Sequence, residues 1–334
     1  MNLNDLVETG LIPASRKNSL EPVAARYAVA ISPTIADLIA KEGDAIARQF
    51  LPSEAELLTL PEERPDPIGD AAHSPVEGIV HRHKDRVLFK PVSVCPVYCR
   101  FCFRREMLGD ATLSSEAMER ALTYIAEHKE IWEVILTGGD PFILSPRRAE
   151  EITQRLAAIP HVKIVRWHTR VPIVDPPRVT DEFIGAIKAT NLTTFVALHA
   201  NHTSEFGEIA RAAIARLVEA GIPMLSQSVL LNGINDNADT LESLMRTFIE
   251  NRIKPYYLHH PDLAPGTSHF RVSIAHGQSL MRELRARLSG IAMPTYVLDI
   301  PGGHAKVPLN SDDVIALENG RYRIRDHAGL WHEY

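Results

Sequence analysis

From residue 87 onward, short apolar runs alternate with longer stretches in which apolar residues recur every three or four positions. The short runs predict strands, and the longer stretches predict amphipathic helices. Strands are expected at residues 87–92, 132–136, 163–167, 193–198, 224–231 and 254–258, with a last one near 294–299. Helices are expected at residues 114–128, 145–159, 181–189, 204–220, 238–250 and 273–288. Six strand–helix units in succession predict an α/β fold whose parallel sheet closes, or nearly closes, into a barrel.

The first 80 residues have a different character. Apolar residues recur with helical spacing over residues 34–50, which predicts a helix there, while the proline- and acid-rich stretch 60–78 predicts an irregular connection. We therefore expect an N-terminal helical extension and linker at 1–80, a core at 81–310 and a C-terminal tail at 311–334.

Composition and charge exclude several classes of function. The chain has 334 residues, 45% of them hydrophobic, and a formal net charge of −6, so it offers no basic field for nucleic acid. Its N-terminus lacks the basic and apolar regions of a signal peptide, and no apolar run approaches the roughly 18–20 residues of a membrane span. We expect a cytoplasmic protein in a reducing setting, with no nucleic-acid or membrane partner.

All three cysteines of the chain, Cys95, Cys99 and Cys102, lie in one loop after the first predicted strand. Structural cysteines are usually scattered through a core, a zinc site usually takes four ligands in CxxC-type pairs, and a disulfide would leave the third thiol over. Three thiolates on one loop suit a [4Fe–4S] cluster in which one iron stays open to a further ligand. In a barrel, the loops that follow the strands carry the chemistry.

With Phe101 before the last cysteine, this loop resembles the CxxxCxφC signature of radical S-adenosylmethionine (radical SAM) enzymes, in which φ is aromatic. The resemblance implies a partial (β/α)6 radical SAM barrel, preceded here by an N-terminal helical segment. It also implies that S-adenosylmethionine binds the open iron and yields a 5′-deoxyadenosyl radical. Gly138, Gly139 and Asp140 resemble the motif that receives the methionine amino group, although alone they would indicate an ordinary turn. Two further matches to S-adenosylmethionine-binding positions are His199 and Gln227.

Longer motifs resemble the lysine 2,3-aminomutase family over about the last 270 residues: DPIGDAAHSPVEG, HRHKDRVLF, LTGGDP, SQSVLL, PYYLHHPDLAPGTSHFR and SGIAMPTYVLDIPGGHAKVPL. The resemblance implies an isomerase that converts L-lysine to β-lysine with pyridoxal 5′-phosphate as a further cofactor. Lys306 then anchors that cofactor as a Schiff base, and Arg82 and Arg86 bind its phosphate. On local sequence alone, Lys306 would be a surface lysine in a turn and the two arginines would be solvated charges.

Substrate recognition follows the same resemblance. Arg104 matches the residue that pairs with the substrate carboxylate, while Asp262 and Asp299 match two acids that hold the distal ammonium. Two carboxylates around one ammonium disfavour glutamate. They do not discriminate lysine from arginine or ornithine.

Some positions depart from the metabolic lysine aminomutases. His83 and His259 stand where those enzymes carry tyrosines, His304 and Ala305 replace glycines, and a zinc-binding C-terminal extension is missing. This short form is similar to the enzyme that makes β-lysine for elongation factor P, so we expect a functional link to that factor and no zinc. The electron donor is expected to be a flavodoxin or ferredoxin. The alternatives are a radical SAM aminomutase for another basic amino acid and a non-catalytic iron–sulfur protein.

Overall fold

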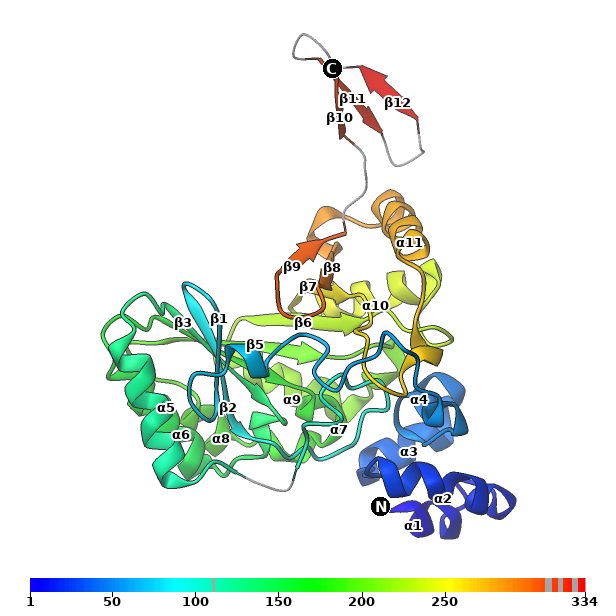
Figure 1. Cartoon of the computed structure of the whole chain (residues 1–334), viewed down its shortest axis with the longest axis horizontal. Helices are drawn as coiled ribbons and strands as arrows, with labels where there is room; N and C mark the ends of the chain where they lie inside the picture. The colour runs from blue at the N-terminus through cyan, green and yellow to red at the C-terminus, as the bar shows by residue number, and fades with distance from the viewer. Residues whose placement is uncertain (110–111, 310–313, 318–320, 326–329, 334) are drawn as a thin grey trace.

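The computed structural model describes residues 1–109, 112–309, 314–317, 321–325 and 330–333. Its main element is a nine-stranded sheet with the order β1 to β9, and the strands from β2 to β8 pair in parallel (Figure 1). These parallel strands are β2 (Arg86–Val92), β3 (Glu133–Gly138), β4 (Ile164–Thr169), β5 (Thr193–His199), β6 (Met224–Val229), β7 (Ile253–His259) and β8 (Thr295–Asp299). The sheet curls into a partial barrel, which confirms the predicted fold class.

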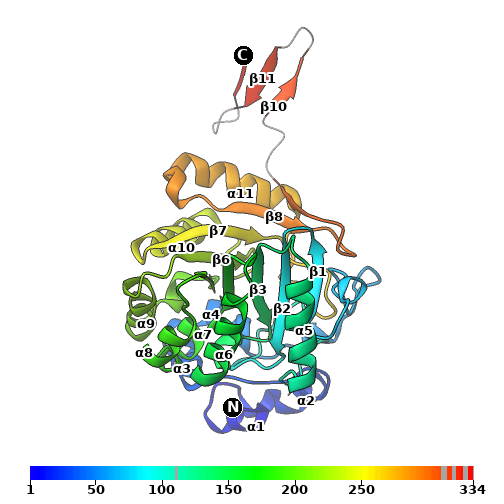
Figure 2. The same cartoon turned by 90° about the vertical axis from the view of Figure 1, so that its left-hand side faces the viewer.

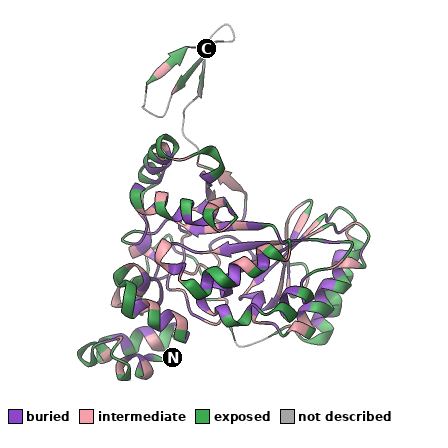
Figure 3. Ribbon diagram, turned by 180° about the vertical axis from the view of Figure 1, so that it is seen from behind, coloured by how far each residue is buried: buried purple, intermediate pink, exposed green. Residues whose placement is uncertain are grey.

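Helices follow the strands in the expected alternation and cover the outside of the sheet (Figure 2). They are α5 (Ser115–Glu127), α6 (Pro146–Ala157), α7 (Val171–Val174), α8 (Asp181–Ala186), α9 (Glu208–Glu219), α10 (Ala238–Glu250) and α11 (Ile274–Arg287). Each long helix buries an apolar face toward the sheet and exposes its other face (Figure 3). The apolar spacing in the sequence arises from this one-sided burial.

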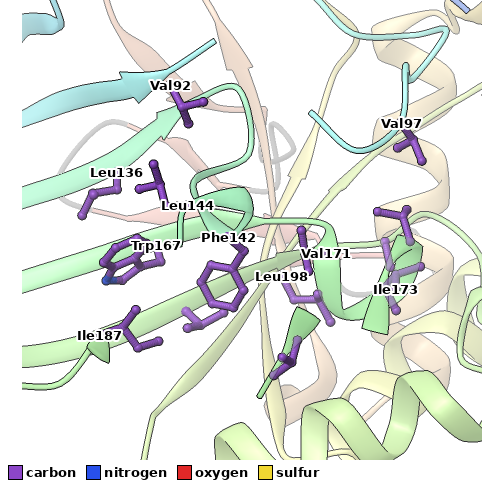
Figure 4. Close-up of a cluster of buried hydrophobic side chains, with 14 of the residues drawn as sticks. Val92, Val97, Leu136, Phe142, Leu144, Trp167, Val171, Ile173, Ile187 and Leu198 are labelled. Atoms are coloured by element: carbon purple, nitrogen blue, oxygen red, sulfur yellow. The ribbon is translucent and has the colours of Figure 1, made fainter. Parts of the chain in front are cut away.

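Part of the hydrophobic core lies between β3–β5 and the short helices that follow β4 (Figure 4). Trp167 is fully buried, and the ring of Phe142 lies 6.0 Å from it and 4.8 Å from Phe183. Val171 and Ile173, just after β4, are buried in the same cluster. The loop after β4 therefore stands on a rigid base and can hold its polar side chains in fixed positions.

The N-terminal segment supports the cysteine loop. It contains α1 (Leu3–Glu8), α2 (Lys17–Arg26), α3 (Pro33–Glu42) and α4 (Asp44–Phe50). The backbone N–H of Tyr98 donates to Ala30 O at 2.8 Å, and that of Arg100 donates to Gln49 O at 2.8 Å. The Arg100 guanidinium also lies 2.6 Å from the carboxylate of Glu56, and neither side chain is exposed. The division at residue 80 stays a prediction, but these contacts join the segment from residue 30 to residue 56 to the cysteine loop.

Several sequence predictions were wrong in detail. The helix expected over residues 34–50 is two helices, because Gly43 adopts a φ of +76° and ends α3. Helix α9 starts at Glu208 instead of residue 204, because Thr203–Glu205 forms a 3-10 turn first.

Two edge strands and a small second sheet were missed. Strand β1 (Ile79–His83) pairs antiparallel with β2, and β9 (Lys306–Pro308) pairs antiparallel with β8. Strands β10 (Val314–Ala316), β11 (Tyr322–Arg325) and β12 (Trp331–Glu333) form a separate sheet within the segment predicted as a tail. Across the described residues, none of the helices has the length and apolar character needed to span a bilayer.

Candidate active site

The cysteine loop leaves the C-terminal end of β2, and its three cysteines are partly buried. Burial raises the pKa of each thiol, to about 11 for Cys102, and the neighbouring cysteines raise the pKa of Cys95 and Cys102 further. The three thiols are therefore close enough to repel one another as thiolates and carry no disulfide. Such a group needs a metal to remain deprotonated, which is the chemistry of a cluster ligand set.

The side chains of the three cysteines do not by themselves form a metal-binding arrangement. Within the described residues, the structure holds no group of three or more His, Cys, Asp or Glu side chains in a geometry ready for a metal ion. The three cysteines nevertheless share one short loop, which supplies three soft sulfur donors. The donor set therefore fits a [4Fe–4S] cluster by its chemistry, and the ligand roles of these cysteines stay predictions.

Gly138 and Gly139 let the end of β3 pass against the cysteine loop. A Cβ atom on Gly139 would lie 2.1 Å from Val94 O, so a larger residue would push the two segments apart. The N–H groups of Gly139 and Asp140 donate to Val92 O and Val94 O at 2.8 and 2.9 Å. The motif thus fixes the cysteine loop, and its predicted contact with S-adenosylmethionine stays a prediction.

The carboxylate of Asp140 is hydrogen-bonded to other parts of the protein. It accepts hydrogen bonds from Thr169 Oγ1 at 2.7 Å, from the backbone N–H of Arg170 at 2.7 Å and from that of Phe142 at 3.0 Å. Burial raises its pKa, whereas these donors lower it. Asp140 therefore ties the glycine motif after β3 to the loop after β4.

His199 and Gln227 come together at the C-terminal ends of β5 and β6, where they are paired in register. The His199 ring stacks on Phe101 of the cysteine loop, with centroids 5.5 Å apart and planes at 22°. Its Nε2 is buried and finds no hydrogen-bond partner in the described part of the chain. Gln227 Nε2 lies 3.5 Å from His168 Nε2 at the end of β4. An unpartnered polar atom beside the cysteine loop fits a bound ligand, as predicted for S-adenosylmethionine.

Lys306 lies beside Asp299, because β9 returns antiparallel to β8 and pairs the two residues. The Lys306 ammonium donates to the Asp299 carboxylate and lies 3.4 Å from His259 Nδ1. Although burial raises the pKa of Asp299, the His259 and Lys306 side chains lower it well below its usual range. A lysine on a short strand beside a carboxylate and an imidazole is suitably placed to anchor a cofactor.

Asp70 joins two of the predicted arginines and was missed by sequence analysis. Its carboxylate lies 2.8 Å from Arg104 Nη2 and 3.0 Å from Arg82 Nη2, and it is almost fully buried. Arg82 also approaches Asp299, with Nη1 and Oδ1 4.0 Å apart. Arg82 Nε, in turn, is buried and unpartnered among the described residues, so a donor remains there for an anion such as a phosphate. Asp70 belongs to the DPIGDAAH segment that carried part of the family resemblance, which is the signal that could have pointed to it.

Arg86 does not join this cluster. It opens β2 on the other side of the β1–β2 turn from Arg82, and its ion pair is with Asp85 at 2.7 Å. Its charge still lowers the pKa of His83 and Tyr257, although burial dominates both shifts. The two arginines thus have different ion-pair partners among the described residues, and a phosphate contact for Arg86 stays a prediction.

Asp262 follows β7 and faces Asp299 across a small cavity of about 180 Å³. The cavity is lined by Pro67, His260, Pro261, Asp262, Leu263, Ile274, Leu298, Asp299 and Pro301. Burial and the charge of Asp299 raise the pKa of Asp262 to about 7, while Lys306, Arg104 and Arg82 lower it. Two carboxylates in one mostly apolar cavity require a cation between them when both are ionised.

Replacing Asp70 by asparagine is expected to destabilise the protein by about 3 kcal/mol, because breaking a buried ion pair leaves uncompensated charge. Arg82 and Arg104 would lose their shared carboxylate together. Thermal unfolding of Asp70→Asn, compared with Asp175→Asn at the exposed pair with Arg178, measures the effect. Equal melting temperatures for the two variants would contradict the role assigned to Asp70.

Comparison with known proteins adds a family context to this geometry. The model of the Radical SAM superfamily matches residues 89–245. An L-lysine 2,3-aminomutase from Acetoanaerobium sticklandii is 35% identical over 306 residues, which cover 90% of this chain and 74% of that protein. An L-lysine 2,3-aminomutase from Escherichia coli is 37% identical over 268 residues, covering 80% of this chain and 78% of that protein. A glutamate 2,3-aminomutase from Clostridioides difficile is 35% identical over 317 residues, covering 94% and 75%.

Proposed function

Because this chain belongs to the lysine 2,3-aminomutase family of radical SAM enzymes, we propose that it moves the α-amino group of L-lysine to the β-carbon. The family makes it an isomerase that uses a [4Fe–4S] cluster and S-adenosylmethionine. We further propose that it uses pyridoxal phosphate and acts on lysine, with the residue roles given below. When bound, these groups together supply abstraction of a hydrogen atom and stabilisation of a carbon radical.

One observation carries the choice of lysine. Asp262 and Asp299 line the same cavity, and Asp299 contacts Lys306. A substrate attached near Lys306 would extend a distal ammonium toward the two carboxylates, whereas a distal carboxylate would meet two like charges. The relative that acts on glutamate is as similar in sequence as those that act on lysine, so the two acids argue for lysine more strongly than overall identity does.

The other charged side chains would position the substrate. Arg104 is held by Asp70 and presents a guanidinium suited to the α-carboxylate. Arg82, held by the same carboxylate and with an Nε that has no partner among the described residues, is suited to a phosphate. Lys306 would hold the cofactor until lysine takes its place. The surrounding barrel would keep water from the reacting carbon.

Kinetic discrimination tests this proposal. We expect reconstituted enzyme under anaerobic conditions to convert L-lysine with a kcat/KM at least about 100-fold above that for L-glutamate, because burying like charges together costs several kcal/mol. Arginine and ornithine serve as the other arms, since the two acids attract them as well. Faster turnover of glutamate, arginine or ornithine than of lysine would overturn the substrate assignment while leaving the aminomutase family intact.

The pH dependence gives a second prediction. Asp262, with a pKa of about 7, is mostly neutral at pH 6 and mostly ionised at pH 8. Its attraction for the lysine ammonium therefore grows as the pH rises, and kcat/KM for lysine should rise about tenfold over this interval, in step with the ionised fraction. In Asp262→Asn the rise should disappear and KM should stay high. An identical rise in the variant would assign the titration to another group.

We also propose a flavodoxin or ferredoxin as electron donor, because cluster reduction needs a one-electron carrier. The free thiols favour a reducing compartment such as the cytoplasm. The support for a role in supplying β-lysine for elongation factor P is the sequence resemblance alone. Loss of the β-lysyl modification on that factor after deletion of the gene, restored by added β-lysine, would support this role, whereas full modification in the deletion strain would contradict it.

A further inference from the structure

A buried arginine outside the predicted site points at one of the cysteines. Arg170 follows β4, and its Nη1 lies 3.0 Å from Cys99 Sγ, within hydrogen-bond distance for sulfur. The side chain is 7% exposed, and its guanidinium carbon lies 4.5 Å from the ring centre of Phe50 and 5.4 Å from that of Phe101. Arg170 therefore contacts the cysteine loop in a region shielded from water.

Other contacts fix the direction of this guanidinium. Its Nη2 donates to Gln49 Oε1 and to Glu205 Oε2, each at 2.6 Å. Gln49 and Glu205 are bonded to each other and to Asn201, so these acceptors are themselves held in place. The backbone N–H of Arg170 is bonded to Asp140 at 2.7 Å. With Nη2 and the backbone held, Nη1 can face only the cysteine loop.

A purely structural role does not account for this arrangement. To clamp α4 to the turn that carries Glu205, the Nη2 contacts would be enough, and the hydrogen bond to sulfur would add nothing. Hydrogen bonds to the sulfurs of an iron–sulfur cluster, however, are among the features that set its reduction potential. The bond to Cys99 is such a contact once Cys99 ligates iron.

We propose that Arg170 is a positioning residue that acts through Cys99, donating a charge-assisted hydrogen bond to the cluster-ligating sulfur and raising the reduction potential of the cluster. An added electron increases the negative charge on the sulfurs, so a cationic donor stabilises the reduced cluster more than the oxidised one. The effect makes the first reduction easier for a weak electron donor. This role of Arg170 goes beyond the proposed function, because the effect on the reduction potential is the same whichever amino acid is rearranged.

Redox titration of the reconstituted cluster, followed by electron paramagnetic resonance, tests this role without any turnover. In Arg170→Gln we expect the equilibrium constant for reduction to fall about tenfold, which equals about 59 mV for one electron. Arg178→Gln is the matched control, since Arg178 lies in the same segment but pairs with Asp175 at the surface. A wild-type potential in Arg170→Gln with full iron content would overturn the proposal.

A second measurement keeps the test decisive if Arg170→Gln fails to fold or to take up iron. Wild-type holoprotein carrying ¹⁵N only in the arginine guanidinium groups should show a magnetic coupling between that nitrogen and the reduced cluster. We assign this coupling to Arg170, so it should vanish in Arg170→Lys. It should persist in Arg104→Lys, because Arg104 pairs with Asp70. Its absence from the wild type, or its persistence in Arg170→Lys, would overturn the proposal.

Discussion

The variant Lys306→Arg should lose β-lysine formation by about 10³-fold or more, the scale of losing a group that acts directly in catalysis. Arginine keeps a positive charge beside Asp299 and His259, so the local ion pair and the fold should survive. It cannot, however, form a Schiff base with pyridoxal phosphate. The variant therefore separates the electrostatic role of Lys306 from its covalent role.

The measurements are the visible absorbance of bound pyridoxal phosphate and the rate of β-lysine formation in purified protein. Lys254→Arg is the matched control, because the acceptors of Lys254 in the described part of the chain are the backbone carbonyls of Ile291 and Met293, away from the site. Full activity and a retained Schiff-base absorbance in Lys306→Arg would show that another lysine is the anchor.

Cys102→Ser should remove the iron–sulfur cluster and reduce activity to background. The remaining two thiols cannot hold a [4Fe–4S] cluster that needs three protein ligands, and the chain has no other cysteine to replace the third. Serine is close in size to cysteine, so the loop and its supports at Tyr98 and Arg100 should persist. Cleavage of S-adenosylmethionine should stop together with the amino shift.

Iron and sulfide content, the electron paramagnetic resonance signal of the reduced cluster, and 5′-deoxyadenosine formation give three independent readings. Glu106→Gln is the control on the same loop, since its exposed side chain lies toward Arg26 and away from the thiols. A Cys102→Ser protein with wild-type iron content and cluster signal would contradict the placement of the cluster on this loop.

The sequence predicted those parts of the protein that depend on local pattern. Strand β3 is buried on both faces along its centre, so it reads as an apolar run. Helices such as α10 show a one-sided apolar face that gave their bounds. The cysteine loop was recognised because its three thiols are close in sequence. Strands β1 and β9 are short and partly polar, and they lie at the sheet edges, so their pattern was too weak.

The features that the sequence did not predict depend on contacts between distant parts of the chain. Asp70 bonds to Arg104, 34 residues away, and Arg170 bonds to Cys99, 71 residues away, so no spacing rule joins them. Arg82 and Arg86 lie on paired strands joined by a turn, and the four-residue spacing alone does not show that Arg82 pairs with Asp70 while Arg86 pairs with Asp85. Partners held together by tertiary packing are visible only in the folded chain.

We propose that this enzyme moves nitrogen from C2 to C3 of the same lysine molecule. The most direct test is anaerobic turnover of lysine labelled with ¹⁵N at the α-amine and ¹³C at C3, diluted in an excess of unlabelled lysine, followed by nuclear magnetic resonance of the product. We predict a product in which the labelled nitrogen is bonded directly to the labelled carbon. Unchanged lysine from protein with a full cluster and both cofactors, or a product whose nitrogen comes from elsewhere, would contradict the account.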